Sequence, residues 1–175
     1  MQAMTTVPMI PDGYQAVTPW VIVRGVPAFI DFLIEVFDAK ETIRMYADDG
    51  VRVSHAEVRI NGAPVMMFDS ADLWPPTPAY LRVYVADCAE VLRRATLAGA
   101  RIVTEPTDLF FGDRIGRFSD PWGNLWWVHT HVAEPSPEDL AAAAGTPEAA
   151  EALRYVEETL EAEMQRRGRA HPDAG

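Results

Sequence analysis

A pattern of β-type and helical segments occurs twice along this 175-residue chain. In the first half, a β-rich run at residues 14–24 precedes an amphipathic helix at Val26–Ala39, and three further β-type runs follow, the last ending at Ser70. The same order of strand, helix and three strands returns after the proline-rich segment 74–78, with a period of about 60 residues. The pattern predicts two βαβββ modules, each of which must cover an apolar sheet face by packing against another module or chain.

The predicted fold class is α+β, with the two modules forming a curved mixed-sheet cup and a helical tail following them. The expected boundaries are a domain at 12–132, with modules at 14–70 and 78–132, and a tail at 133–175. A long helix is expected from about Pro147, and its apolar stripe should dock on the domain or on a partner subunit. The members of this stripe are Leu153, Val156, Leu160 and Met164.

The composition excludes several classes of partner. A net charge of -11 disfavours nucleic acid, because phosphate binding requires clustered Lys and Arg, although a local pocket can still be basic. No apolar run approaches the roughly 20 residues that cross a bilayer, and the first residues do not resemble a secretion signal. The single cysteine, Cys88, cannot form an internal disulfide and is expected to be a buried small residue. A cytoplasmic location is therefore expected.

Three segments resemble a known family. TPWVIVRGVPAFIDFLIEVFDA, HAEVRING and FGDRIGRFSDPWGNLWWVHTHVAEPSPEDL are similar to the opening and closing parts of the PhnB-like branch of the vicinal oxygen chelate superfamily, the glyoxalase, bleomycin-resistance and dioxygenase group. The most specific part is the turn that begins with Asp120 and Pro121. There Asp120 can accept backbone N–H groups, and Gly123 can adopt the dihedral angles that reverse the chain.

The resemblance implies paired modules, a homodimer and, in the metalloenzymes of the family, a divalent ion. That ion is held by His, Glu or Gln from the first and last strand of each module. The matching positions here are Thr18, Met66, Tyr80 and Trp127. These side chains make a poor divalent site, so we expect neither a metal nor another cofactor.

Strand alternation predicts what replaces the metal ligands. Residues two apart on a strand point to the same face of the sheet. The face that carries the four matching positions is therefore expected to hold mainly aromatic and apolar side chains, with a few polar ones. Such a lining suits a planar organic ligand, so a small-molecule-binding protein is predicted, with antibiotic sequestration as one role. The candidate ligand-binding residues are Thr18, Trp20, Met66, Phe68, Tyr80, Arg82, Tyr84, Arg114, Trp127 and His129.

Other functions stay open at this point. His55, Glu57 and His129 are candidate catalytic residues of a cofactorless isomerase, epimerase or cyclase. In that reaction one of the two histidines would move a proton together with Glu57 or Asp113, and Arg82 or Arg114 would stabilise the developing anion. A displaced ion site would instead combine His55 and Glu57 with His129 and His131, as in a metal-dependent lyase or dioxygenase. Asp113 beside Arg114 is more simply a local ion pair of the hairpin. In a third class, the cup is filled by its own side chains and the protein acts only by interaction.

Overall fold

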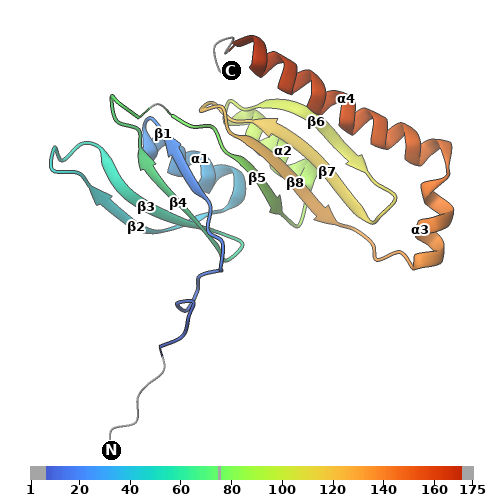
Figure 1. Ribbon diagram of the computed structural model, residues 1–175, viewed down its shortest axis with the longest axis horizontal. Coiled ribbons are helices and arrows are strands. Elements are labelled where there is room, and N and C mark those ends of the chain that lie inside the picture. Colours follow the sequence, from blue (N-terminus) through green and yellow to red (C-terminus); the bar gives the residue numbers. More distant parts are fainter. Residues whose placement is uncertain (1–6, 75, 171–175) are drawn as a thin grey trace, which may run out of the picture. The chain divides into compact units, whose positions relative to one another are not determined.

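The computed structural model describes residues 7–74 and 76–170, which leaves the end of the predicted tail outside it. Its contacts divide the chain between Thr77 and Pro78 into two compact units, with Glu35–Phe37 grouped with the second. Within each unit the order is strand, helix and three strands, and the strands form one four-stranded mixed sheet (Figure 1). The predicted pair of βαβββ modules is confirmed.

The first unit holds the sheet β1-β4-β3-β2. Its elements are β1 (Trp20–Val23), α1 (Val26–Phe37), β2 (Lys40–Tyr46), β3 (Val53–Ile60) and β4 (Ala63–Asp69). β1 pairs with β4 in parallel, whereas β4 with β3 and β3 with β2 are antiparallel. The parallel pair is possible because α1 carries the chain across the sheet between the first strand and the hairpins.

The first strand is shorter than the sequence predicts. The β-type run at 14–24 forms a strand only from Trp20, which lies opposite Met66 in the parallel ladder. Pro19 has no N–H group to donate, and its carbonyl accepts the N–H of Met66 at 3.0 Å. The expectation of a strand at 14–19 is therefore wrong, and this stretch forms turns and loop.

The second unit repeats this topology as β5-β8-β7-β6 and adds the C-terminal helices. Its elements are β5 (Tyr80–Tyr84), α2 (Cys88–Leu97), β6 (Arg101–Asp108), β7 (Asp113–Ser119), β8 (Leu125–His131), α3 (Pro137–Ala144) and α4 (Pro147–Ala170). β5 and β8 are parallel. The long helix begins at Pro147, as predicted.

Equivalent side chains fix the start of the crossover helix in each unit. In the first, Asp69 at the end of β4 accepts the N–H groups of Gly25 and Val26 at 2.7 and 3.0 Å. In the second, Thr130 of β8 accepts the N–H of Cys88 at 2.8 Å. These bonds satisfy donors that the first turn of a helix leaves unpaired, and they hold each helix on one face of its sheet.

The Asp-Pro-x-Gly-Asn turn joins β7 to β8. Asp120 Oδ2 accepts Nδ2 of Asn124 and Nε1 of Trp126 at 2.8 and 2.9 Å, while its Oδ1 accepts two backbone N–H groups of the turn. Asn124 in turn accepts the N–H of Ala79, just before β5, at 2.9 Å. Gly123 has φ +89°, as the sequence predicts. This buried network fixes the first and last strands of the unit to each other.

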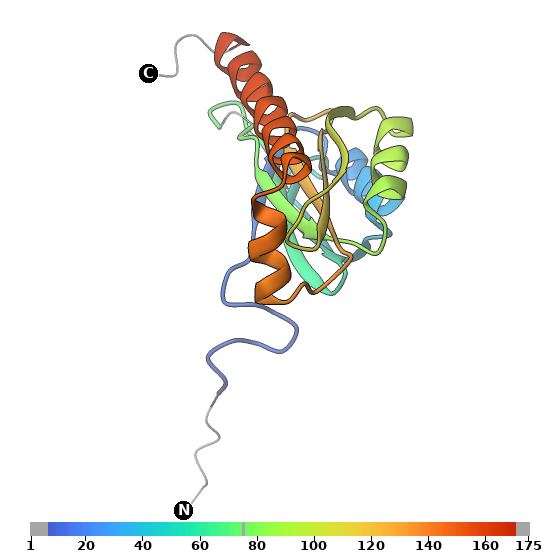
Figure 2. The ribbon, with the colours of Figure 1, turned by 90° about the vertical axis from the view of Figure 1, so that its right-hand side faces the viewer.

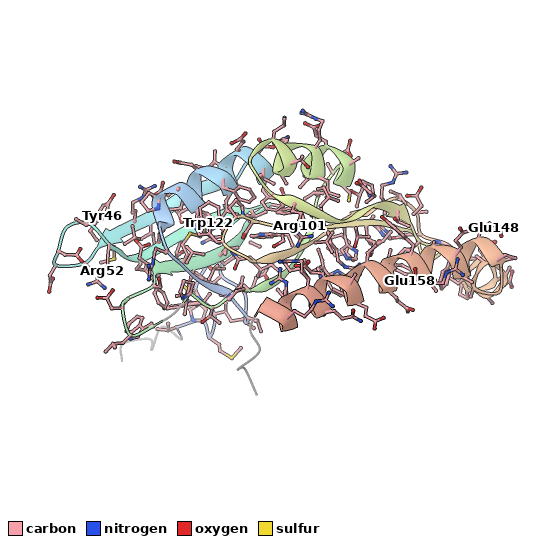
Figure 3. The ribbon with its side chains drawn as sticks, turned by 90° about the horizontal axis from the view of Figure 1, so that it is seen from above. Tyr46, Arg52, Arg101, Trp122, Glu148 and Glu158 are labelled. Carbon is pink, nitrogen blue, oxygen red and sulfur yellow. The ribbon has the colours of Figure 1, made fainter. Side chains whose placement is uncertain are left out.

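Two helices cover opposite faces of the second sheet (Figures 2 and 3). On one face, a Cβ added at Gly116 would lie 2.6 Å from Leu92 of α2, so glycine permits the close approach of helix and strand. On the other face, Val156 of α4 packs with Ile115 and Leu109. The predicted docking of the C-terminal stripe on the domain is confirmed for this part of α4.

A buried carboxylate holds the second half of α4. Glu163, only 2% exposed, accepts hydrogen bonds from Arg101 of β6 at 2.6 Å and from Arg166 and Arg167 of its own helix at 2.9 and 2.7 Å. Burial by itself would raise the pKa of Glu163, but the three guanidinium groups lower it to about 2. The helix is thus attached to β6 by a charged cluster as well as by apolar contacts.

Substitution of Asp120 is expected to destabilise the second unit strongly. Asp120→Ala leaves the indole N–H of Trp126 and the amide groups of Asn124 without an acceptor in a buried turn. The expected loss is about 2–4 kcal/mol of unfolding free energy, measured by urea denaturation. Asp48→Ala, in an exposed turn of the first unit, is the control and should change the free energy by less than about 0.5 kcal/mol. Equal losses of unfolding free energy in the two variants would contradict the role of Asp120 as the buried acceptor that stabilises the β7–β8 turn.

The stability contributed by Glu163 should depend on acid pH. Because its folded pKa of about 2 lies below the ordinary 4.5, the contribution is complete above pH 4.5 and is lost as the pH falls toward 2. Glu163→Gln should lower the unfolding free energy at neutral pH by about 3 kcal/mol, with a difference from the parent protein that shrinks below pH 4.5. Glu161→Gln, on the same helix but exposed, is the control. A difference in unfolding free energy that stays the same from neutral to acid pH would contradict the role of Glu163 as an ionised carboxylate paired with the three arginines.

Candidate functional site

One face of the second sheet gathers most of the predicted ligand-binding residues of this unit. This surface, here called the aromatic face, is the side of the sheet away from α2. Its members on the first and last strands are Tyr80, Arg82, Tyr84, Leu125, Trp127, His129 and His131. Tyr80 and Tyr84 are 61% and 49% exposed, so these rings are not part of a closed core. The predicted strand alternation agrees with this placement.

A cavity of about 250 Å³ lies on the aromatic face and is lined by Tyr80, Leu81, Arg82 and Trp127. Arg82 and Trp127 are direct neighbours in the parallel ladder. Behind Trp127, the guanidinium of Arg117 lies 4.3 Å from the indole centroid, in a cation–π contact. The indole is therefore held in place while part of it borders the cavity.

Asp113 of β7 organises the polar groups of this face. Its carboxylate lies 2.9 Å from Nδ1 of His129 and 2.9 Å from Nδ1 of His131, and it accepts the hydroxyl of Tyr84 at 3.0 Å. Because a carboxylate only accepts, Nδ1 of each histidine carries the proton. Arg82 Nη2 lies 3.5 Å from the same carboxylate. Burial by itself would raise the pKa of Asp113, but the hydrogen bonds from His131, His129 and Tyr84 lower it to about 2.

The two histidines bound to Asp113 have opposite pKa shifts. Burial lowers the pKa of His129, with Asp113 opposing the shift, whereas the hydrogen bond to Asp113 raises the pKa of exposed His131. His129 is therefore neutral at pH 7, and its Nε2 is an acceptor. That nitrogen is buried and has no hydrogen-bond partner among the described residues.

The first unit carries a different polar group on the corresponding face. Glu57 of β3 is buried and accepts the Tyr14 hydroxyl at 2.8 and 3.0 Å, and Nε2 of His55 lies 3.1 Å from it. The hydrogen bond to Glu57 raises the pKa of Tyr14. Arg59 contacts the same loop, with its guanidinium over the Tyr14 ring and a hydrogen bond to the Gly13 carbonyl. The N-terminal loop thus covers Glu57 and restricts its use as a base.

Aromatic side chains lie next to this group. Trp20 packs edge-on against Phe68 with centroids 5.2 Å apart, and its ring lies 6.2 Å from that of His55. Phe68 also meets Trp74 at 5.7 Å. Trp20 is 55% exposed. The first unit therefore presents a second aromatic surface, built around a carboxylate rather than around arginines.

The structure shifts the register of two predicted positions. Thr18 precedes β1, so the residue opposite Met66 is Trp20; likewise, the residue opposite Trp127 is Arg82, two positions after Tyr80. Arg114 lies on the α2 side of the second sheet, where it is opposite Thr130. Its ion partner is Asp108, at 2.6 Å, rather than the neighbouring Asp113, so the proposed hairpin pair is wrong.

Two residues of these sites, Arg117 and Tyr14, were not among the sequence candidates, and the contact of Asp113 with both histidines at once was not expected. Asp113 and Arg117 alternate along β7, and this spacing is the signal that could have placed them opposite His131 and Trp127. No sequence pattern links Tyr14 to Glu57, since a loop contact over 43 residues has no periodicity. Cys88 is buried as predicted, and burial raises its pKa to about 12.

The side chains do not fit the divalent ion that the family's metalloenzymes hold. Hydroxyl, thioether, phenol and indole groups occupy the positions that the resemblance assigns, Thr18, Met66, Tyr80 and Trp127, and an indole offers no lone pair to a metal. The residues that the strand register places opposite Met66 and Trp127 are Trp20 and Arg82, an indole and a cation, which fit a divalent ion no better. Within residues 7–74 and 76–170, no group of three or more His, Cys, Asp or Glu side chains is arranged to bind an ion. Instead, His55 is hydrogen-bonded to Glu57, and His129 and His131 are each hydrogen-bonded to Asp113.

The opposite pKa shifts of the two histidines can be measured directly. In an NMR titration of the ring Cε1–H signals, His131 should titrate above 6.5 and His129 below it. Asp113→Asn should lower both pKa values, because the carboxylate favours the protonated form of each ring. His55, in the first unit, serves as the internal control. A His129 pKa above that of His131 would contradict the hydrogen-bonding scheme.

Comparison with known proteins agrees with this architecture. The chain is 34% identical over 139 residues to the uncharacterized protein Mb0911c of Mycobacterium bovis, covering 73% of this chain and 91% of the relative. Among solved structures, TioX from Micromonospora sp. ML1 matches with a TM-score of 0.56 and 25% identity over 67% of this chain and 99% of its own. The PhnB protein from Bacillus cereus has a TM-score of 0.51 and 19% identity over 66% of this chain and 99% of its own.

The family model matches residues 15–128, which cover both βαβββ modules up to the middle of β8 and leave out the C-terminal helices. α3 and α4 are therefore an addition to the part of the chain that the family shares. The protein belongs to the glyoxalase/bleomycin resistance protein/dioxygenase superfamily.

Proposed function

We propose that the protein binds a small planar aromatic molecule on the aromatic face of the second unit, without a divalent ion. The observation that carries this proposal is the cavity beside Trp127, whose walls include Tyr80 and Arg82. Its volume of about 250 Å³ suits a compound of about two fused rings. The aromatic rings at the cavity can stack on a planar ligand, and the guanidinium of Arg82 can fix its orientation.

The exposure of the rings supports binding over a purely structural role. A buried aromatic contributes to the core, but Tyr80 and Tyr84 are largely exposed on the side of the sheet away from α2. Exposed apolar surface costs free energy, and a contiguous patch of it marks a contact site. We propose sequestration of such a compound as the biological role, which requires binding and no chemical step.

The expected setting is a homodimer in the cytoplasm. Family membership supports the dimer, and in this proposal a second copy is the only macromolecular partner. In the part of the chain that the structure describes, no helix is sufficiently long and apolar to cross a membrane. Nucleic acid is disfavoured by the net charge of -11.

Proton-transfer catalysis is the second candidate, favoured by the pairing of Asp113 with His129. A carboxylate that orients a neutral imidazole is the usual support of a general base. The buried Nε2 makes this the weaker proposal, because a base must reach the proton that it removes. Its test is deuterium incorporation into carbonyl compounds in D₂O followed by NMR, which His129→Gln should abolish. Incorporation unaffected by this variant would eliminate His129 as the base.

Ligand binding should depend on Trp127. Calorimetric titration with 2-naphthamide, a neutral two-ring probe, should show binding that Trp127→Ala weakens by at least about tenfold, as for a buried aromatic contact. Phe111→Ala removes an exposed aromatic of the same unit from a hairpin loop and should leave the affinity unchanged. EDTA should have no effect. Binding that disappears with EDTA, or that is equal in both variants, would overturn the proposal.

A further inference from the structure

Two arginines flank the indole of the aromatic face. In the strand register, Arg82 of β5 and Arg117 of β7 are both direct neighbours of Trp127 on β8, one on each side. The next residue along this row is Thr104 of β6, opposite Arg117. The row therefore has the order arginine, tryptophan, arginine, threonine across the sheet.

Arg117 is a buried cation without an acidic partner. Its residue is 4% exposed, and its Nη1 donates to the Val156 carbonyl of α4 at 2.6 Å and to Oγ1 of Thr104 at 3.0 Å. Nε has no hydrogen-bond partner, and no carboxylate forms an ion pair with this guanidinium among the described residues. Burying a charge with only neutral partners costs free energy, and it leaves a positive potential that solvent screens weakly.

Arg82 adds a second positive charge at the cavity. Its side chain is 53% exposed, and Asp113, at 3.5 Å, is its carboxylate neighbour. Of the two arginines of the row, only Arg82 lies within ion-pair distance of Asp113, and Arg117 forms no ion pair among the described residues. The carboxylate therefore offsets at most one of the two guanidinium charges, and the face keeps a net positive charge. The surplus is local, since the whole chain carries a charge of -11.

The C-terminal helix adds to this charge rather than cancelling it. Arg167 of α4 lies over the Tyr80 ring, with its guanidinium carbon 5.6 Å from the centroid. Glu163 is the acid of this helix that reaches β6, and it is bound by three arginines, including Arg101. An anion near Tyr80 and Trp127 therefore lies close to the guanidinium groups of Arg82 and Arg167, while the buried Arg117 contributes its charge from behind the indole.

We propose that the compound bound on the aromatic face is an aromatic acid, whose carboxylate or similar planar anionic group pairs with Arg82 while its ring packs on Trp127. This inference rests on the proposed function and adds the charge of the ligand. A guanidinium and a carboxylate form two parallel hydrogen bonds, which an ammonium or a neutral amide cannot reproduce. Arg117 lies over one face of the Trp127 indole and polarises the π electrons toward its positive charge. The opposite face of the indole is therefore poorer in electrons and stacks better with an electron-rich ring.

The decisive experiment compares two probes that differ only in charge. Calorimetric titrations of the full-length protein with 2-naphthoate and 2-naphthamide should give at least about tenfold tighter binding of the carboxylate, the effect of one charged hydrogen-bonded pair. Raising the salt concentration should reduce this preference, because Arg82 is half exposed. Arg82→Gln should reduce the preference to less than about threefold, and Arg82→Lys should keep part of it.

The control is Arg93→Gln, which removes the same charge from an exposed position on α2, and it should keep the full preference. Circular dichroism establishes that each variant is folded. Equal affinities for the two probes would contradict the inference that the ligand is an anion, but would still agree with the proposed binding of an aromatic compound. Failure of both probes to bind would overturn the proposed function and this inference with it. A preference for naphthoate that survives in Arg82→Gln would refute the assignment to Arg82.

Discussion

The parallel pairing of the first and last strand in each unit is the constraint on which both candidate surfaces depend. It places β1 beside β4 and β5 beside β8, although about 45 residues separate the paired positions. Arg82 and Trp127 are neighbours only because of this ladder. In the second unit, the buried Asp120 and Asn124 network connects the end of β7 to the backbone before β5, and so fixes the register that creates the site.

The crossover helices decide which face of each sheet is available. Asp69 and Thr130, at equivalent positions, accept the first N–H groups of α1 and α2, so each helix starts over the same side of its sheet. The side chains on the other side are then free to diverge between the units. The first unit places Glu57 where the second places Arg117, opposite Met66 and Trp127 respectively. One topology therefore supports an acidic group in one unit and a basic row in the other.

The C-terminal helix gives the second unit its electrostatic character. α4 lies outside the region matched by the family model, yet its Val156 carbonyl accepts a hydrogen bond from buried Arg117 and its Arg167 lies over Tyr80. Without an acceptor from α4, the guanidinium of Arg117 would need water or an acid in its place. The helix thus permits a cation to stay buried behind Trp127, which a sheet alone could not do.

The sequence by itself determined the repeat, the helix starts, the turn at Asp120 and the grouping of Tyr80, Arg82, Trp127 and His129, because these follow from periodicity and local turn chemistry. It also indicated that the family's metal positions hold poor ligands. Only the tertiary structure decided the partners: Asp113 with two histidines, Arg114 with Asp108 and Arg117 with the carbonyl of Val156. Register between distant strands and the docking of a helix are set by packing across the whole unit, and no local pattern in the chain encodes them.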